Sequence, residues 1–155
     1  MKNYPVIALL LISIICNAQN DIKVQPYFSA IMVSNAEQSS KWYGEIFGLT
    51  VRNRYDSKEG GYKQVIMHSP EMLIELIELQ AMVVRDSILN NRPKGTGIIG
   101  FSKFGFIAPR FDELHQFLTD KKVTFAGRTV RDNVSGKRTF LIRDLDNNLL
   151  QFFEP

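Results

Sequence analysis

The sequence has little of several residue types that define common protein classes. Its 155 residues include one cysteine, Cys16, one tryptophan and two histidines. A single cysteine excludes a disulfide framework within the chain and a zinc site built from several thiolates. The chain also lacks a large excess of charge of either sign, because 19 basic residues are interspersed with 16 acidic ones. We therefore expect no nucleic-acid partner.

A hydrophobic run long enough to cross a membrane is also missing near the start of the chain. The apolar stretch over residues 5–15 is about half of the roughly 20 residues that a spanning helix needs. It follows Lys2 and precedes Cys16-Asn17-Ala18, an arrangement typical of a secretory signal peptide over residues 1–18. We therefore expect cleavage after Ala18, export to the periplasm or the extracellular space, and no stable membrane insertion afterwards.

Two alternatives remain open for this segment. It could be a buried N-terminal helix, although no amphipathic pattern marks one of its faces. It could also be a lipoprotein leader with the lipid on Cys16, but Ile15 then occupies a position where Gly, Ala or Ser is usual. Ordinary cleavage would leave residues 19–155 as a single domain without any cysteine.

The rest of the chain shows a βαβββ pattern twice. In the first module, residues 26–80, a strand over 27–33 leads through Ser34-Asn35, a helix N-cap signal, into a helix that stops at Gly48. Three further strands are predicted in this module, over 49–55, 62–68 and 72–79. Residues 81–98 are expected to form a linker.

The second module, residues 99–155, repeats this order. Its strands are predicted over 100–108, 123–130, 138–142 and 149–153, and a helical face is formed by Phe111, Leu114, Phe117 and Leu118. An offset of 75 residues relates Gly61 to Gly136 and Ser69 to Asp144, so that both hairpin turns of the modules coincide. This indicates an internal structural repeat whose two halves share a core.

The residues at the start and end of the repeat carry a family resemblance. Val33-Ser34-Asn35, the following Trp42 to Leu49, and the closing segment Arg143 to Gln151 resemble the corresponding motifs of the vicinal oxygen chelate superfamily. That superfamily includes glyoxalase I, extradiol dioxygenases, fosfomycin-resistance enzymes and bleomycin-binding proteins. The resemblance implies an α+β fold in which duplicated βαβββ modules form a mixed, curved eight-stranded sheet system around a central cleft.

The resemblance also implies positions for functional residues. In the superfamily's enzymes, the first and last strand of each module supply the ligands of a divalent metal. Matching the motifs places Phe28, Glu75, Lys103 and Gln151 at these four positions, and we expect all four to face one cleft and to bind a ligand there. A phenyl ring has no lone pair to donate, an ammonium repels a cation, and an amide is a weaker, neutral ligand. We therefore expect no cofactor; if a divalent metal is present, Glu75 and Gln151 are its expected ligands.

Three points about this site stay open. Lys103 is interpreted as a partner of Glu75 near the position of the lost metal, but a register shifted by one residue would instead turn Phe104 and Phe106 into the cleft. His68 and His115 are the remaining residues that could be recruited as metal ligands. We expect His68 to have a plain role at a strand end and His115 to be a solvated residue on a helix face.

These observations favour an exported protein that binds a small organic molecule with an apolar ring and an anionic or carbonyl group. The alternative is a divalent-metal-dependent lyase or dioxygenase of the superfamily with an atypical ligand set, so whether the protein is an enzyme stays undecided at this point. A third reading is a structural protein whose cleft is filled by its own side chains. A homodimer is left open as well, because the modules could pair within one chain or across two.

Overall fold

A computed structural model describes residues 25–57 and 59–155 of the protein. The expected signal peptide, residues 1–18, lies outside the described residues. No helix within the described ranges is long and apolar enough to span a bilayer.

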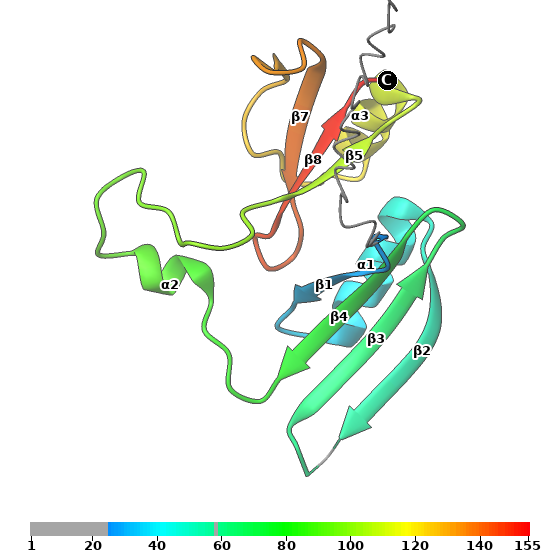
Figure 1. The fold of residues 1–155 in the computed structure, drawn as a ribbon, viewed down its shortest axis with the longest axis vertical. Helices are drawn as coiled ribbons and strands as arrows, with labels where there is room; N and C mark the ends of the chain where they lie inside the picture. Colours follow the sequence, from blue (N-terminus) through cyan, green and yellow to red (C-terminus); the bar gives the residue numbers. More distant parts are fainter. Residues whose placement is uncertain (1–24, 58) are drawn as a thin grey trace, which may run out of the picture.

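Both βαβββ modules are present, and each forms one four-stranded mixed sheet (Figure 1). The N-terminal sheet has the order β1-β4-β3-β2 and the C-terminal sheet the order β5-β8-β7-β6. In each sheet the first strand pairs in parallel with the last, and the other pairings are antiparallel. The N-terminal module consists of β1 (Ser29–Met32), α1 (Ala36–Phe47), β2 (Thr50–Ser57), β3 (Tyr62–His68) and β4 (Leu73–Leu79). The C-terminal module consists of β5 (Phe104–Ile107), α3 (Phe111–Asp120), β6 (Val130–Arg131), β7 (Arg138–Arg143) and β8 (Leu149–Phe153).

The boundaries of α1 follow from its capping residues. The Asn35 side chain accepts a hydrogen bond from the Gln38 backbone N–H, which satisfies one of the free donors of the first turn. At the other end Gly48 adopts a left-handed conformation, with φ 66°, and its N–H donates to the Gly44 carbonyl. The helix limits predicted from the sequence are therefore confirmed.

Alternation along the strands gives each sheet one face toward the core and one face away from it. In the N-terminal sheet, Val65, Met67, Ile74 and Leu76 are buried on the α1 side. Glu75 lies between two of these residues in sequence and therefore belongs to the other face. In the C-terminal sheet, Phe140, Ile142, Leu150 and Phe152 are buried on the α3 side.

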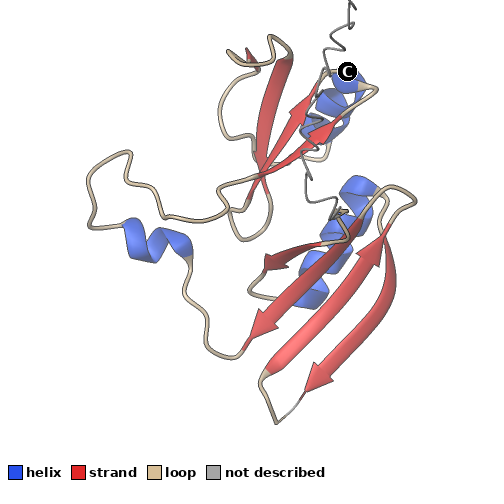
Figure 2. Ribbon diagram, viewed as in Figure 1, coloured by secondary structure: helices blue, strands red, loops and turns tan. Residues whose placement is uncertain are grey.

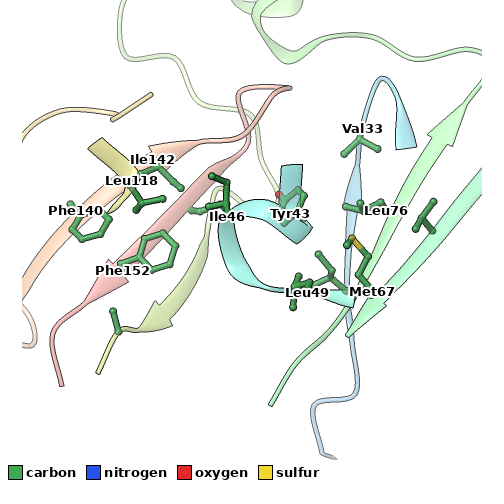
Figure 3. Close-up of a cluster of buried hydrophobic side chains, with 14 of the residues drawn as sticks. Val33, Tyr43, Ile46, Leu49, Met67, Leu76, Leu118, Phe140, Ile142 and Phe152 are labelled. Carbon is green, nitrogen blue, oxygen red and sulfur yellow. The ribbon is translucent and has the colours of Figure 1, made fainter. Parts of the chain in front are cut away.

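Helix α1 lies between the two modules and joins their cores (Figures 2 and 3). The Phe47 ring at its C-terminal end stacks on Phe106 and Phe152 of the C-terminal sheet, with centroid distances of 6.2 and 5.8 Å. Its residues Tyr43 and Ile46 are buried between the sheets. The faces of the two sheets that point away from this shared core are called the outward faces below.

The structure differs from the sequence-based prediction in the connections. The strand predicted over 123–130 is reduced to a single bridge, from Phe125 to Ile142, and the two residues of β6. The strand predicted over 100–108 is limited to the four residues of β5. The expected linker contains a short helix, α2 (Arg85–Leu89), which has no buried residue. Short pairings at a sheet edge have little hydrophobic alternation to identify them, which explains these errors.

Candidate functional site

The outward face of the N-terminal sheet is mostly apolar and carries one carboxylate near its centre. Glu75 in β4 is flanked across the strands by Ala30 in β1 and Ile66 in β3. Neighbouring positions on the same face are occupied by Met32, Leu73, Ile77, Tyr62, Gln64 and His68. Glu75 is half-buried, so its carboxylate is partly shielded from water by apolar neighbours. This is a surface suited to an apolar molecule that carries one polar group.

The outward face of the C-terminal sheet places an amide at its centre. Gln151 in β8 lies between Gly105 in β5 and Leu141 in β7, and it is only 4% exposed. Its Nε2 donates to the Thr139 hydroxyl over 2.9 Å, and that hydroxyl donates to the Phe152 carbonyl over 2.8 Å. This chain of hydrogen bonds fixes the orientation of the amide and leaves its oxygen as the group that can accept from a ligand.

Phe28 and Lys103 occupy matching places just before the first strands of the two modules. Both are exposed, and both lie in alternation with the outward residues of the strand that follows. The neighbours Phe104 and Phe106 are instead packed against the shared core, with their rings 4.7 Å apart. The shifted register, which would have turned these two rings into the cleft, is therefore wrong.

Lys103 has an acidic residue of its own module, Asp132, in its surroundings. Hydrogen bonds from Ser135 are the main cause of a lowered pKa at Asp132, and the charge of Lys103 contributes to it. Lys103 is thus close to the turn between β6 and β7. No ion pair in the described ranges joins it to Glu75.

The four predicted site residues are divided between two outward faces. Phe28 and Glu75 belong to the N-terminal sheet, and Lys103 and Gln151 belong to the C-terminal sheet. Helix α1 and the shared core lie between these sheets. Within one chain, the structure therefore brings the residues together in pairs and not as a group of four around one cavity. An open hollow of about 340 Å³ lies elsewhere, at the β2–β3 hairpin, and is lined by Asp56, Lys63 and Glu78 among others.

The side chains at these four positions do not fit a divalent metal. Glu75 is the one carboxylate among them, Phe28 has no lone pair to donate, Lys103 carries a positive charge, and the Gln151 amide can offer only its neutral oxygen. Across the described residues, no group of three or more His, Cys, Asp and Glu side chains is close enough to hold an ion. His68 is exposed at the end of β3, on the same face as Glu75.

The expected position of His115 requires a correction. It was predicted to be a solvated residue on a helix face, but its ring contacts Phe125 and Phe140, with centroid distances of 4.7 and 5.1 Å. Phe117, by contrast, was predicted on the apolar face and is 37% exposed. The buried face of α3 therefore differs from the predicted one. The chain after the helix folds back, and Phe125 covers the side of the helix that carries His115.

Asp144 has a role that its sequence position did not reveal. It was interpreted as a turn residue, and its Oδ1 does accept from the N–H groups of Asp146 and Asn148. Its Oδ2 also accepts from the buried Tyr43 hydroxyl of α1 over 2.9 Å. The same turn is bound to the end of β1, because the Ser34 N–H donates to the Asp146 carboxylate. Asp144 therefore joins the two modules.

The buried phenol of Tyr43 should make the free energy of unfolding decrease at alkaline pH. Burial is the main cause that raises the pKa of Tyr43 far above its usual value near 10, and the Asp144 carboxylate adds to it. Since the folded pKa is raised, the stabilisation is complete below pH 10 and is lost progressively as the pH rises above it. We expect the free energy of unfolding, measured in urea from pH 8 to 11, to fall less steeply in Tyr43→Phe. Tyr55→Phe, at an exposed tyrosine, should follow the unmodified protein, and a Tyr43→Phe curve of unchanged slope would contradict this assignment.

Comparison with known proteins identifies the family. The family model described as Glyoxalase/Bleomycin resistance protein/Dioxygenase superfamily matches residues 26–152. The chain belongs to this superfamily. The expected α+β fold of duplicated modules is thereby confirmed. No curated protein matches the sequence at a significant level.

Solved structures of the superfamily share the fold at low sequence identity. A glyoxalase family protein from Enterococcus faecalis is 18% identical, with a TM-score of 0.72 over 84% of this chain and 97% of that one. A glyoxylase/bleomycin resistance protein/dioxygenase domain from Frankia sp. EAN1pec is 17% identical, with a TM-score of 0.67 over 86% and 93%. The fosfomycin resistance protein FosX from Listeria monocytogenes is 12% identical, with a TM-score of 0.62 over 86% and 95%. At these identities the likeness establishes the fold alone.

Proposed function

We propose that the protein is an exported, metal-independent binding protein for a small organic molecule, built on the glyoxalase/bleomycin-resistance fold with a degenerate metal site. The observation that carries this proposal is the chemistry of the four site positions. Phe28 provides an apolar ring and Lys103 a cation, and neither can ligate a metal. Intact-mass analysis of the exported protein tests the first part: its N-terminus should be Gln19, without residues 1–18 and without a lipid on Cys16.

The ligand is inferred from what the site residues can contact. Phe28 and the apolar outward face of the N-terminal sheet suit a ring. The Lys103 ammonium suits an anionic or carbonyl oxygen, and the fixed Gln151 amide offers its own oxygen to a donor. Neither outward face holds a nucleophile with an adjacent base in the described hydrogen bonds, which supports binding over catalysis.

A binding screen with a metal arm tests this proposal. We expect aromatic carboxylates or thiol conjugates to raise the melting temperature of residues 19–155, because a ligand that binds only the folded state stabilises it. Zn, Ni, Mn and Fe should give no such shift, and elemental analysis should find no stoichiometric metal. Lys103→Met should weaken the ligand shift.

One observation favours the alternative of a metal-dependent lyase or dioxygenase. His68 and Glu75 occupy neighbouring strands on the same outward face, so they are the pair from which an atypical metal site would be built. About one equivalent of metal that is lost in Glu75→Ala, and retained in the exposed control Glu45→Ala, would establish this alternative and overturn the binding-protein proposal.

A further inference from the structure

The connection between the two modules carries large apolar side chains that the rest of the described chain leaves uncovered. Residues 81–101, called the linker arm below, lie between β4 and β5 and include the short helix α2, which has no buried residue. The linker arm projects from the body of the molecule (Figures 1 and 2). Six of its large apolar side chains are exposed, namely Val83, Val84, Ile88, Ile98, Ile99 and Phe101. Exposed apolar side chains that are gathered in one segment mark a contact site for a protein or a membrane.

The second half of the linker arm is its least covered part. All residues from 90 to 101 are exposed, and the side chains of Ile99 and Phe101 are fully so. A Cβ added at Gly95 or Gly100 would have no heavy atom within 4 Å apart from those of its chain neighbours. The body of the molecule therefore leaves both the backbone and the side chains of this half accessible to another molecule.

The linker arm also has an excess of positive charge. It contains three basic residues, Arg85, Arg92 and Lys94, and one acidic residue, Asp86. The Asp86 carboxylate accepts a hydrogen bond from the Asn147 amide of the C-terminal module. In the part of the chain that the structure describes, none of the three cations forms an ion pair with an acidic side chain. The excess of two positive charges is most of the net charge of +3 that the whole chain carries.

This combination favours a lipid surface as the partner of the linker arm. Segments that bind at the surface of a bilayer place apolar side chains at the boundary of the acyl chains and basic ones among the headgroups. An anionic bilayer also attracts each nearby lysine or arginine through its negative surface potential. A protein partner fits less well, because lysine is depleted in protein interfaces and Lys94 lies close to Ile99 in the sequence.

We propose that the linker arm binds the surface of an anionic lipid bilayer. The side chains of Ile99 and Phe101 enter the boundary of the acyl chains, and those of Arg92 and Lys94 contact lipid phosphates. The protein is thereby held reversibly at a membrane without spanning it. This goes beyond the proposed function, because it uses none of the four candidate ligand-binding residues and leaves both sheets free to bind a small molecule.

Vesicle binding tests the proposal on residues 19–155. The probes are vesicles of phosphatidylcholine alone, and vesicles of equal parts of phosphatidylcholine and phosphatidylglycerol, which add anionic headgroups. We expect the protein to sediment with the anionic vesicles and to bind the neutral ones about tenfold more weakly, because the charge of the linker arm then has no counterpart. Equal binding to both kinds of vesicle, or binding to neither, would overturn the proposal.

Two paired variants separate the apolar and the electrostatic contributions. Ile99→Ser with Phe101→Ser should weaken binding to anionic vesicles about tenfold, because it removes the two fully exposed apolar side chains. Arg92→Gln with Lys94→Gln should weaken binding to anionic vesicles and leave the weak binding to neutral ones unchanged. Both variants should keep the melting temperature of the unmodified protein, since these side chains are exposed. Unchanged vesicle binding in the first variant would contradict the proposal.

Matched controls lie outside the linker arm. Val134→Ser changes an almost fully exposed apolar residue in the turn between β6 and β7. Lys41→Gln with Lys121→Gln removes two exposed cations, one in α1 and one at the end of α3. Both controls should bind vesicles like the unmodified protein. A decrease as large as that in the linker-arm variants would mean that binding depends on overall charge or hydrophobicity and would refute a specific role of the linker arm.

A fluorescent label locates the contact, because residues 19–155 contain no cysteine. An environment-sensitive dye attached to the Phe101→Cys variant should become brighter when anionic vesicles are added. The same dye attached to the Val134→Cys variant should not change. If the dye at residue 101 instead responds to rising protein concentration and not to vesicles, the linker arm docks on another protein chain and the proposal is wrong.

Discussion

Asp144→Ala is expected to lower the free energy of unfolding by about 3 to 4 kcal/mol, measured in urea at pH 7. The Asp144 carboxylate is 7% exposed and accepts hydrogen bonds from the Tyr43 hydroxyl, two backbone N–H groups and the Asn148 amide. Its removal leaves the phenol of Tyr43 buried without its acceptor, and an unsatisfied buried donor costs more than an average hydrogen bond contributes. The loss should exceed that of Tyr43→Phe, which removes one of these bonds.

A matched control exists in the other hairpin of the same module. Asp132 also accepts from backbone N–H groups of its own turn, those of Val134 and Ser135, but among the described residues it has no hydrogen bond to the N-terminal module. Asp132→Ala should therefore cost far less than Asp144→Ala. Equal losses would mean that Asp144 acts as an ordinary turn residue and does not join the modules.

Phe152→Ala is expected to cost about 4 kcal/mol, within the range for a buried phenylalanine replaced by alanine. The Phe152 ring is 3% exposed and stacks on Phe106, Phe140 and Phe47, with centroid distances of 5.1, 5.2 and 5.8 Å. Its removal leaves a cavity where the C-terminal sheet meets α1. Phe117→Ala, at a half-exposed ring of α3, should cost less than about 1 kcal/mol.

A double-mutant cycle extends this prediction to the contact between the modules. Phe47 and Phe152 come from different modules, so their coupling measures the interface directly. We expect a coupling of about 1 kcal/mol in the unfolding free energies, as found for stacked aromatic pairs. A coupling near zero would show that the two modules are stabilised independently.

The order of the elements could be predicted from the sequence because local signals mark it. Asn35 and Gly48 cap α1 at the predicted residues, and β3 and β8 have the predicted limits. The repeat identified two equivalent sheets because a 75-residue offset superimposes turns, which depend on residues close together in the chain. These features need no knowledge of distant contacts.

Features that depend on distant contacts could not be predicted in this way. Tyr43 and Asp144 are 101 residues apart, and neither neighbourhood indicates the other. The prediction that His115 is solvated was wrong because Phe125 covers it. Phe125 belongs to a segment that forms a single bridge in place of the expected strand. Strand alternation alone determines on which face of its sheet each candidate site residue lies. Whether the two faces meet in one cleft depends on how the modules pack together, which the alternation does not show.

The position of Asp144 in the chain also affects the order in which the protein is made. Synthesis proceeds from the N-terminus, so α1 and the N-terminal sheet are complete while the C-terminal module is still missing. Until Asp144 and β8 have been made, the Tyr43 hydroxyl lacks the carboxylate to which it donates, and the Phe47 ring lacks Phe152, one of the two rings of the C-terminal sheet on which it stacks. The shared core can therefore be completed only after β8 has been made. A chain that stops before Asp144 would lack both of these contacts, and the side of α1 that carries Tyr43 and Phe47 would then be accessible to chaperones and proteases.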